Sequence, residues 1–185
     1  KDLDKEVLKL LKLIKPFRPK LFVAITGTNG KTSTTWYLSQ ICKINKIPSK
    51  LIGTLGYFVN MKKIKETTLT TPSNLDLYQF AHSSIKQNYN CISEASSHGI
   101  HQDRFKNIKI DVAAITNISH DHLDYHKSFD EYVNTKISLL TKSLNSNGVA
   151  VINSQLKKYK IIEKKLKNKK IKMITYGSKD VFFII

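Results

Sequence analysis

The chain has 185 residues, 41% of them hydrophobic and 24% charged, and a formal net charge of +17. This length is enough for one well-buried domain with little room for a second, and the composition excludes a disordered chain. No apolar run approaches the roughly 20 residues that cross a bilayer, and the first residues lack a signal-peptide pattern, so we expect no membrane partner.

The first half of the chain reads as alternating helices and strands. The opening segment is a short amphipathic helix, in which Val7, Leu8, Leu11 and Ile14 recur at helical spacing. The continuous apolar run 21–26 is typical of a strand buried on both faces. Glycine punctuation and the cap signal at Ser73 or Asn74 after Pro72 place the next elements. These are a helix over 31–44, a strand–turn–strand over 49–60 and a helix over 74–87.

The second half continues the alternation. Short apolar runs predict strands at 90–96, 111–116, 148–153 and 171–177, with a further strand beginning at 181–185. Helical stretches are expected at 128–144 and 154–168. Strands that alternate with helices form right-handed βαβ units, so we predict an α/β fold: a doubly wound, mostly parallel sheet with helices on both faces. Ligands gather at the carboxyl ends of the strands in such sheets.

The high positive charge raises the question of nucleic-acid binding. Most of it is lysine, and the densest run, 157–172, alternates Lys with Ile and Leu as a solvated helix face does. The run lacks the aromatic and glycine interleaving that stacks bases, so we predict no nucleic-acid partner. The charge favours small ligands that are rich in phosphate. A polyanion-binding basic surface stays open as an alternative.

The two cysteines, Cys42 and Cys91, lie far apart inside apolar segments. This arrangement is neither a disulfide framework nor a metal-ligand spacing. We expect both to be buried thiols in a reducing cytoplasm.

The segment "GTNGKT" (27–32) joins the first buried strand to a helix. In this context the backbone N–H groups and the positive helix end can surround a phosphate chain, and the two glycines allow close approach. The ammonium of Lys31 can reach the β- and γ-phosphates, and the hydroxyl of Thr32 can bind Mg²⁺. Ile25 replaces the first glycine of the longer phosphate-loop motif. A kinase or a motor ATPase could also use this loop, and Glu94 is the candidate acidic magnesium partner in each class.

Three further segments narrow the choice. "LTTPSNLDLY" (69–78), "SEASSHGIHQDRF" (93–105) and "TNISHDHLDYHKSFDEYVNTK" (116–136) follow the glycine loop in order, and "LIGTLGY" is a weaker additional match. Together they resemble the Mur ligase family, specifically its MurE type, which adds the third amino acid to UDP-N-acetylmuramoyl-L-alanyl-D-glutamate. The motifs cover residues 21–153. Ala95, His101 and Asp103 depart from the usual pattern, as does the basic stretch after residue 153, without removing a functional group.

The resemblance implies an ATP- and Mg²⁺-dependent ligase that acts through an acyl phosphate, and it assigns roles to individual residues. In such a reaction ATP phosphorylates a substrate carboxylate, and an amine then displaces the phosphate. Both steps concentrate negative charge, so the site needs fixed cations. The ATP-binding set is Gly27, Thr28, Asn29, Gly30, Lys31, Thr32 and Ser33. The catalytic set is Lys31, Glu94, His122 and Lys136. The magnesium ligands are Thr32, Glu94, His122 and Lys136, the last as a CO₂-derived carbamate.

The resemblance also implies substrate contacts and partners. The residues expected to hold the UDP-N-acetylmuramoyl-dipeptide are Thr70, Thr71, Ser96, Gln102 and Arg104. An arginine fork suits a carboxylate or phosphate. The second substrate is an amino acid, diaminopimelate or lysine, and a monomer is expected. The rivals are another Mur or folylpolyglutamate-type ligase and a non-catalytic nucleotide-binding fragment with a polyanion-binding surface.

The histidine-rich stretch "SHDHLDYH" (119–126) also admits a zinc interpretation. No H-E-x-x-H pattern or cysteine pair accompanies it, which disfavours zinc. We expect His98 to be a helix-start or packing residue, and Tyr125 and His126 to orient the loop.

The resemblance divides the chain into two parts. Residues 1–20 are expected to be a leading helix and linker from an N-terminal domain, and residues 21–185 to be a central ATP-binding domain that is incomplete at its C-terminus. On this interpretation the 185-residue chain binds nucleotide weakly and ligates nothing alone.

Overall fold

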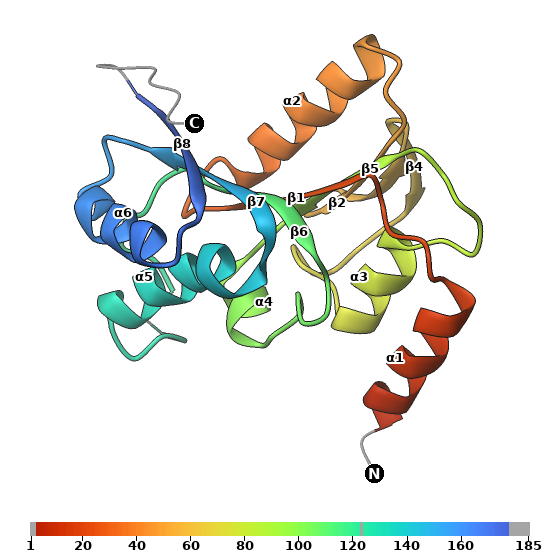
Figure 1. The fold of residues 1–185 in the computed structure, drawn as a ribbon, viewed down its shortest axis with the longest axis horizontal. Coiled ribbons are helices and arrows are strands. Elements are labelled where there is room, and N and C mark those ends of the chain that lie inside the picture. The colour runs from red at the N-terminus through yellow and green to blue at the C-terminus, as the bar shows by residue number, and fades with distance from the viewer. Residues whose placement is uncertain (1–2, 123, 178–185) are drawn as a thin grey trace.

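The computed structural model describes residues 3–122 and 124–177. They form a layered α/β fold around one eight-stranded sheet in the order β4-β3-β2-β5-β1-β6-β7-β8 (Figure 1). The neighbouring strands along β2-β5-β1-β6-β7-β8 pair in parallel, whereas the β2–β3 and β3–β4 pairs are antiparallel. The strands are β1 (Leu21–Thr26), β2 (Ser49–Gly53), β3 (Gly56–Val59), β4 (Lys62–Lys65), β5 (Asn90–Glu94), β6 (Ile110–Ile115), β7 (Leu144–Asn153) and β8 (Lys172–Tyr176). The predicted fold class is confirmed.

Helices cover both faces of this sheet (Figure 1). They are α1 (Leu3–Ile14), α2 (Lys31–Ile44), α3 (Asn74–Ala81), α4 (Ser97–His101), α5 (Phe129–Ser138), the π-helical turn η1 (Leu139–Ser143) and α6 (Tyr159–Asn168). In the described ranges none of the helices is long and apolar enough to span a bilayer.

The side chains of each strand alternate between two buried clusters. On β2, Leu51 packs with Cys42 of α2, whereas its neighbour Ile52 packs into the larger cluster on the opposite face. On β5, Ile92 and Cys91 divide in the same way. Period-2 alternation in a sheet with helices on both faces produces this pattern. Both cysteines are buried free thiols, as predicted.

Several element boundaries differ from those predicted. The helix predicted over 74–87 ends at Ala81, where His82 takes an extended conformation as its C-cap. The helix predicted over 128–144 changes to a π-helical turn at Leu139, and β7 begins at Leu144 rather than at 148. The helix predicted from 154 begins at Tyr159. The strand expected at 181–185 lies outside the described residues.

Two elements were not predicted at all. The strand β4 reads "KKIK" and is exposed throughout, so it carries no apolar alternation to detect. The five-residue helix α4 begins at Ser97, after the N-cap Ser96, whose side chain accepts a hydrogen bond from the Gly99 amide. A capping serine followed by only five helical residues leaves no periodicity to recognise.

Candidate active site

The glycine loop lies between β1 and α2, at the carboxyl edge of the parallel strands. Gly30 is the N-cap of α2 with φ 81°, and no side chain caps the helix. The first-turn amides of α2 therefore lack intrahelical acceptors and point their dipoles toward the loop. Gly27 has φ 155°, and a Cβ there would lie 1.9 Å from Thr116 Oγ. Only glycine lets the loop pack this closely against the segment that follows β6.

The segment after β6 fixes the loop from one side. The Thr28 amide donates to the Asn117 carbonyl oxygen at 3.0 Å, and the Asn29 amide donates to Asn117 Oδ1 at 2.9 Å. Thr28 Oγ lies 3.0 Å from the hydroxyl of the buried Tyr132 and accepts from the Ser119 amide. Thr28 is thus turned inward, and the amides that remain for an anion are those of the first turn of α2. Asn117 and Tyr132 were not singled out from the sequence, although Tyr132 lies one helical turn before Lys136.

Two lysines converge on one carbonyl group of the loop. Lys31 Nζ donates to the Gly27 oxygen at 3.0 Å and to the Thr28 oxygen at 2.9 Å. Lys136 Nζ donates to the same Gly27 oxygen at 2.9 Å and lies 4.4 Å from the ring centroid of Tyr132. Lys31 lies in the first turn of α2 and Lys136 in α5, so the fold brings two residues that are distant in sequence to one shared acceptor.

Burial makes both lysines easier to deprotonate than free lysine. Burial, reinforced by the nearby charge of Lys31, lowers the pKa of Lys136 to about 7. Burial also lowers the pKa of Lys31, although the carboxylates of Glu94 and Asp121 oppose that shift. The side chain of Lys136 is only 1% exposed.

The predicted acidic residue, Glu94, lies beside the hydroxyl of Thr32 in the first turn of α2. Glu94 ends β5 and is 1% exposed. Its Oε2 accepts from Thr32 Oγ at 2.8 Å, and its Oε1 accepts from the Thr54 amide at 2.8 Å. A hydroxyl oxygen and a carboxylate oxygen at this separation are the hard oxygen ligands that Mg²⁺ takes. The donor set therefore fits a magnesium ion, which Thr32 and Glu94 would hold.

His122 lies in the loop after β6 with φ 51°. Its amide donates to Asp121 Oδ1 at 2.9 Å, and its ring packs edge-on against His98 at 4.9 Å between centroids. His98 lies in the first turn of α4 and packs on Tyr125 at 4.0 Å, in agreement with its predicted packing role. Within the described residues His122 makes no hydrogen bond or ion pair to Lys31 or Glu94. Its neighbour Asp121 lies close enough for its charge to act on both Lys31 and Lys136. Among the described residues no group of three His, Cys, Asp or Glu side chains could hold a metal ion.

Four of the five predicted substrate residues form one network of hydrogen bonds. Thr71 Oγ donates to the Glu94 carbonyl oxygen at 2.9 Å and accepts from the Ser96 amide at 2.9 Å. Arg104 donates to the Thr71 carbonyl oxygen and, through Nε at 3.1 Å, to Gln102 Oε1. The Gln102 amide in turn donates to the Tyr125 hydroxyl at 3.2 Å. Thr70 is linked to Glu94 through Thr54, whose hydroxyl lies 3.1 Å from Thr70 Oγ and donates to Glu94 Oε2. Ser33 is exposed in the first turn of α2.

Comparison with known proteins decides the family. The family model "Mur ligase middle domain" matches residues 25–182. The chain belongs to the Mur ligase middle domain family.

Relatives of this Mur ligase domain include enzymes named UDP-N-acetylmuramoyl-L-alanyl-D-glutamate--2,6-diaminopimelate ligase. The one from Rickettsia bellii is 35% identical over 181 residues, which are 96% of this chain and 38% of that protein. The one from Buchnera aphidicola subsp. Baizongia pistaciae is 38% identical over 162 residues, 87% of this chain and 31% of that protein. The Mur ligase domain described here thus spans well under half the length of these curated relatives.

Solved structures of related ligases are also similar to this domain. A structure of a UDP-N-acetylmuramoyl-L-alanyl-D-glutamate--2,6-diaminopimelate ligase is 31% identical with a TM-score of 0.77, covering 93% of this chain and 35% of that chain. A bifunctional folylpolyglutamate synthase/dihydrofolate synthase from Yersinia pestis, complexed with AMPPNP and a Mn ion, is 19% identical with a TM-score of 0.66, covering 92% of this chain and 46% of that one. The second likeness shows the fold alone. The resemblance to the MurE type read from the sequence is confirmed.

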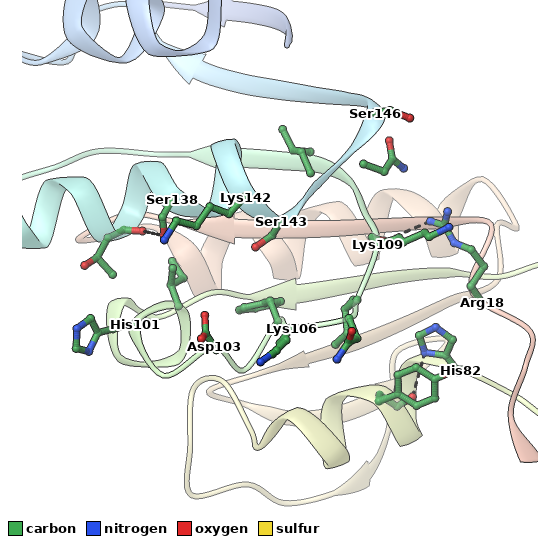
Figure 2. A pocket seen from close by; sticks show the side chains of 18 of the residues that line it. Arg18, His82, His101, Asp103, Lys106, Lys109, Ser138, Lys142, Ser143 and Ser146 are labelled. Atoms are coloured by element: carbon green, nitrogen blue, oxygen red, sulfur yellow. Dashed lines mark hydrogen bonds between the residues drawn. The ribbon is translucent and has the colours of Figure 1, made fainter. Parts of the chain in front are cut away.

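A separate groove of about 1030 Å³ opens at the opposite edge of the sheet of this Mur ligase domain, where β6 and β7 begin (Figure 2). Its lining includes Lys106, Lys109 and Lys142, but none of the predicted site residues. The carboxylates of Asp103 and Glu131 also line it.

Proposed function

We propose that this domain supplies the ATP site of a ligase that joins diaminopimelate to UDP-N-acetylmuramoyl-L-alanyl-D-glutamate through an acyl phosphate. The observation that carries the proposal is the Thr32–Glu94 pair, 2.8 Å apart, beside Lys31 and at the N-terminus of α2. A hydroxyl, a buried carboxylate and an ammonium at a helix N-terminus are the groups that hold a magnesium-bound triphosphate. The names of the relatives supply the choice of diaminopimelate over lysine.

Each residue has a defined task in this proposal. Lys31 gives up its bonds to the Gly27 and Thr28 oxygens and places its ammonium on the β- and γ-phosphates. Thr32 and Glu94 hold one magnesium ion, and His122 and a carbamate on Lys136 hold a second. Bound magnesium neutralises the charge that develops on the transferred phosphoryl group.

The substrate residues bind rather than react. Arg104, Thr71 and Ser96 are linked by hydrogen bonds next to Glu94, and we expect the surface around them to hold a substrate carboxylate near the γ-phosphate. Thr70 and Gln102 flank that surface and offer hydroxyl and amide groups to the sugar-peptide. Such groups suit a ligand that is rich in carbonyl and hydroxyl oxygens.

We further propose the setting in which the domain works. Residues 21–185 act as a central domain, preceded by a leading helix and linker at 1–20, in a cytoplasmic monomer that requires no membrane or nucleic acid. The two cysteines support a reducing compartment, since both are free and buried. The 185-residue chain alone binds nucleotide without ligating.

The basic groove at the amino edge of the strands is the observation that favours the alternative, polyanion binding. Its cationic character is partly cancelled. Arg18 is paired with Asp111, and burial lowers the pKa of His82 to about 4, which leaves that ring neutral near pH 7. With Asp103 and Glu131 also in the lining, the groove offers a mixed surface rather than a continuous cationic one.

A chimera tests the proposed function. In the Rickettsia bellii ligase, the region matched by this chain is replaced by this chain, and release of ADP is followed together with the formation of the tripeptide product. We expect ATP- and Mg²⁺-dependent ligation of diaminopimelate, and lysine to be a poor substitute. A folded chimera that hydrolyses or ligates nothing, although the parent ligase is active under the same conditions, would contradict the proposal.

A further inference from the structure

Thr54 donates a hydrogen bond to each oxygen of the Glu94 carboxylate. Its backbone amide donates to Oε1 at 2.8 Å, and its hydroxyl donates to Oε2 at 3.2 Å. The residue lies in the two-residue turn between β2 and β3, where Gly53 and Gly56 pair across the strands. The turn was singled out from the sequence only as the weak motif "LIGTLGY", with no function attached to it.

The same hydroxyl contacts the loop between β4 and α3 (66–73), here called the substrate loop because it carries the predicted substrate residues Thr70 and Thr71. Thr54 Oγ lies 3.1 Å from Thr70 Oγ. A threonine hydroxyl holds a single proton, and an ionised carboxylate can only accept. The Thr54 proton therefore goes to Glu94, and Thr70 donates its own proton to Thr54. The result is a directed chain of hydrogen bonds from Thr70 through Thr54 to Glu94.

The turn also has to leave room for the carboxylate. A Cβ on Gly53 would lie 2.2 Å from Glu94 Oε1 and 2.7 Å from Cδ. Glu94 is 1% exposed, so its carboxylate has little room to move away from such a Cβ. Gly53 thus permits the close approach, and Thr54 fixes the orientation.

We propose that Thr54 is the positioning residue for the metal-facing carboxylate and that it ties Glu94 to the substrate loop. The inference rests on the proposed function, since it assigns Glu94 to magnesium. When Thr32 turns its oxygen lone pairs toward a cation, its own bond to Oε2 weakens. The two bonds from Thr54 then hold the carboxylate in place. Outer hydrogen-bond partners of this kind orient metal ligands, and their loss commonly costs 10- to 100-fold in metal affinity.

Two variants separate the hydroxyl from the shape of the side chain. Thr54→Val keeps the branched shape and the backbone N–H but loses the hydroxyl, whereas Thr54→Ser keeps the hydroxyl. The readout is the affinity of the 185-residue chain for a non-hydrolysable ATP analogue, measured calorimetrically with and without Mg²⁺. We expect Thr54→Val to reduce the Mg²⁺-dependent gain in affinity about tenfold, with the Mg²⁺-free affinity unchanged. Thr54→Ser should restore the gain to within about twofold of the wild-type value.

A substitution at another threonine of the loop between β4 and α3 serves as the matched control. Thr68 is exposed in that loop, so Thr68→Val should change neither affinity. In the chimera, Thr54→Val should also raise the apparent KM for the UDP-linked dipeptide, whereas Thr68→Val should not. Melting curves confirm that each variant is folded.

The outcomes distinguish a failure of the proposed magnesium-nucleotide site from a failure of the role of Thr54. A wild-type chain whose affinity does not respond to Mg²⁺ would overturn the proposed function itself. A wild-type chain that responds, together with a Thr54→Val chain that responds equally, would overturn the role of Thr54 alone. Because both Thr54 variants keep the amide bond to Oε1, Gly53→Ala provides a harsher second test. It should abolish the Mg²⁺ response, and a normal response in a folded Gly53→Ala chain would overturn the account of the turn.

Discussion

Lys31→Met is expected to slow phosphoryl transfer by about 10²- to 10³-fold in the chimera and to weaken binding of an ATP analogue to the chain. Methionine keeps the unbranched length of lysine but removes the charge and the donors. Lys31 extends from the first turn of α2 over the glycine loop, where its ammonium lies against the Gly27 and Thr28 oxygens. The rate of ADP release and calorimetric titration of the chain give the two measurements.

A lysine on the same helix provides the control for Lys31→Met. Lys43 is exposed in the last turn of α2, far from the loop. Lys43→Met should leave both the rate and the affinity within about twofold, because an exposed charge at that distance is largely screened. Equal losses in the two variants would show that net charge, and not the position of Lys31, determines nucleotide binding.

Lys136→Arg is expected to reduce turnover of the chimera by about 10²-fold or more. The proposal requires the neutral amine to add to CO₂, which forms an N–C bond and releases one proton. Burial and the adjacent Lys31 favour the neutral amine, and they bring the pKa of Lys136 to about 7. Arginine remains charged and cannot form the carbamate, so the site gains no anion for the second metal.

The modification can be observed without turnover. The chain is equilibrated with ¹³C-bicarbonate, and carbon NMR is used to look for a protein-bound carbamate signal. We expect the signal in the wild-type chain and in Lys142→Arg, in which an exposed lysine is changed. The signal should be absent in Lys136→Arg. A carbamate signal that persists in Lys136→Arg, or that disappears in Lys142→Arg, would contradict the assignment.

The strands, and which candidate residues lie at their ends, were largely predictable from the sequence. The apolar run 21–26 gives β1 its observed bounds, and the helix that follows the loop begins at Lys31 as expected. These elements carry the strongest local signals, namely buried strands without alternation and a glycine loop between strand and helix. Parallel strands bring their carboxyl ends to one edge, which explains why Lys31 and Glu94 could be expected together. Lys136 lies within α5 and was expected at the site only from the resemblance.

The features that the sequence did not predict depend on tertiary contacts. Nothing local in "AHSSIKQ" forbids a helix, yet α3 ends at Ala81, and Ser83 pairs with Phe17 in an isolated bridge. The roles of Tyr132 and Thr54 depend on side-chain bonds across 104 and 40 residues of sequence. Spacing along the chain cannot reveal such pairs before the fold is known. The inward turn of Thr28 and its bond to Tyr132 have the same origin.

The central claim is that Thr32 and Glu94 form a magnesium site beside Lys31. The most direct measurement is a crystal structure of the chain with a non-hydrolysable ATP analogue, in which Mn²⁺ replaces Mg²⁺ and is located by its anomalous scattering. The account predicts a Mn²⁺ ion in contact with Thr32 Oγ and Glu94 Oε2, and Lys31 Nζ on the phosphates. Nucleotide bound elsewhere, or a metal ion that contacts neither oxygen, would contradict it.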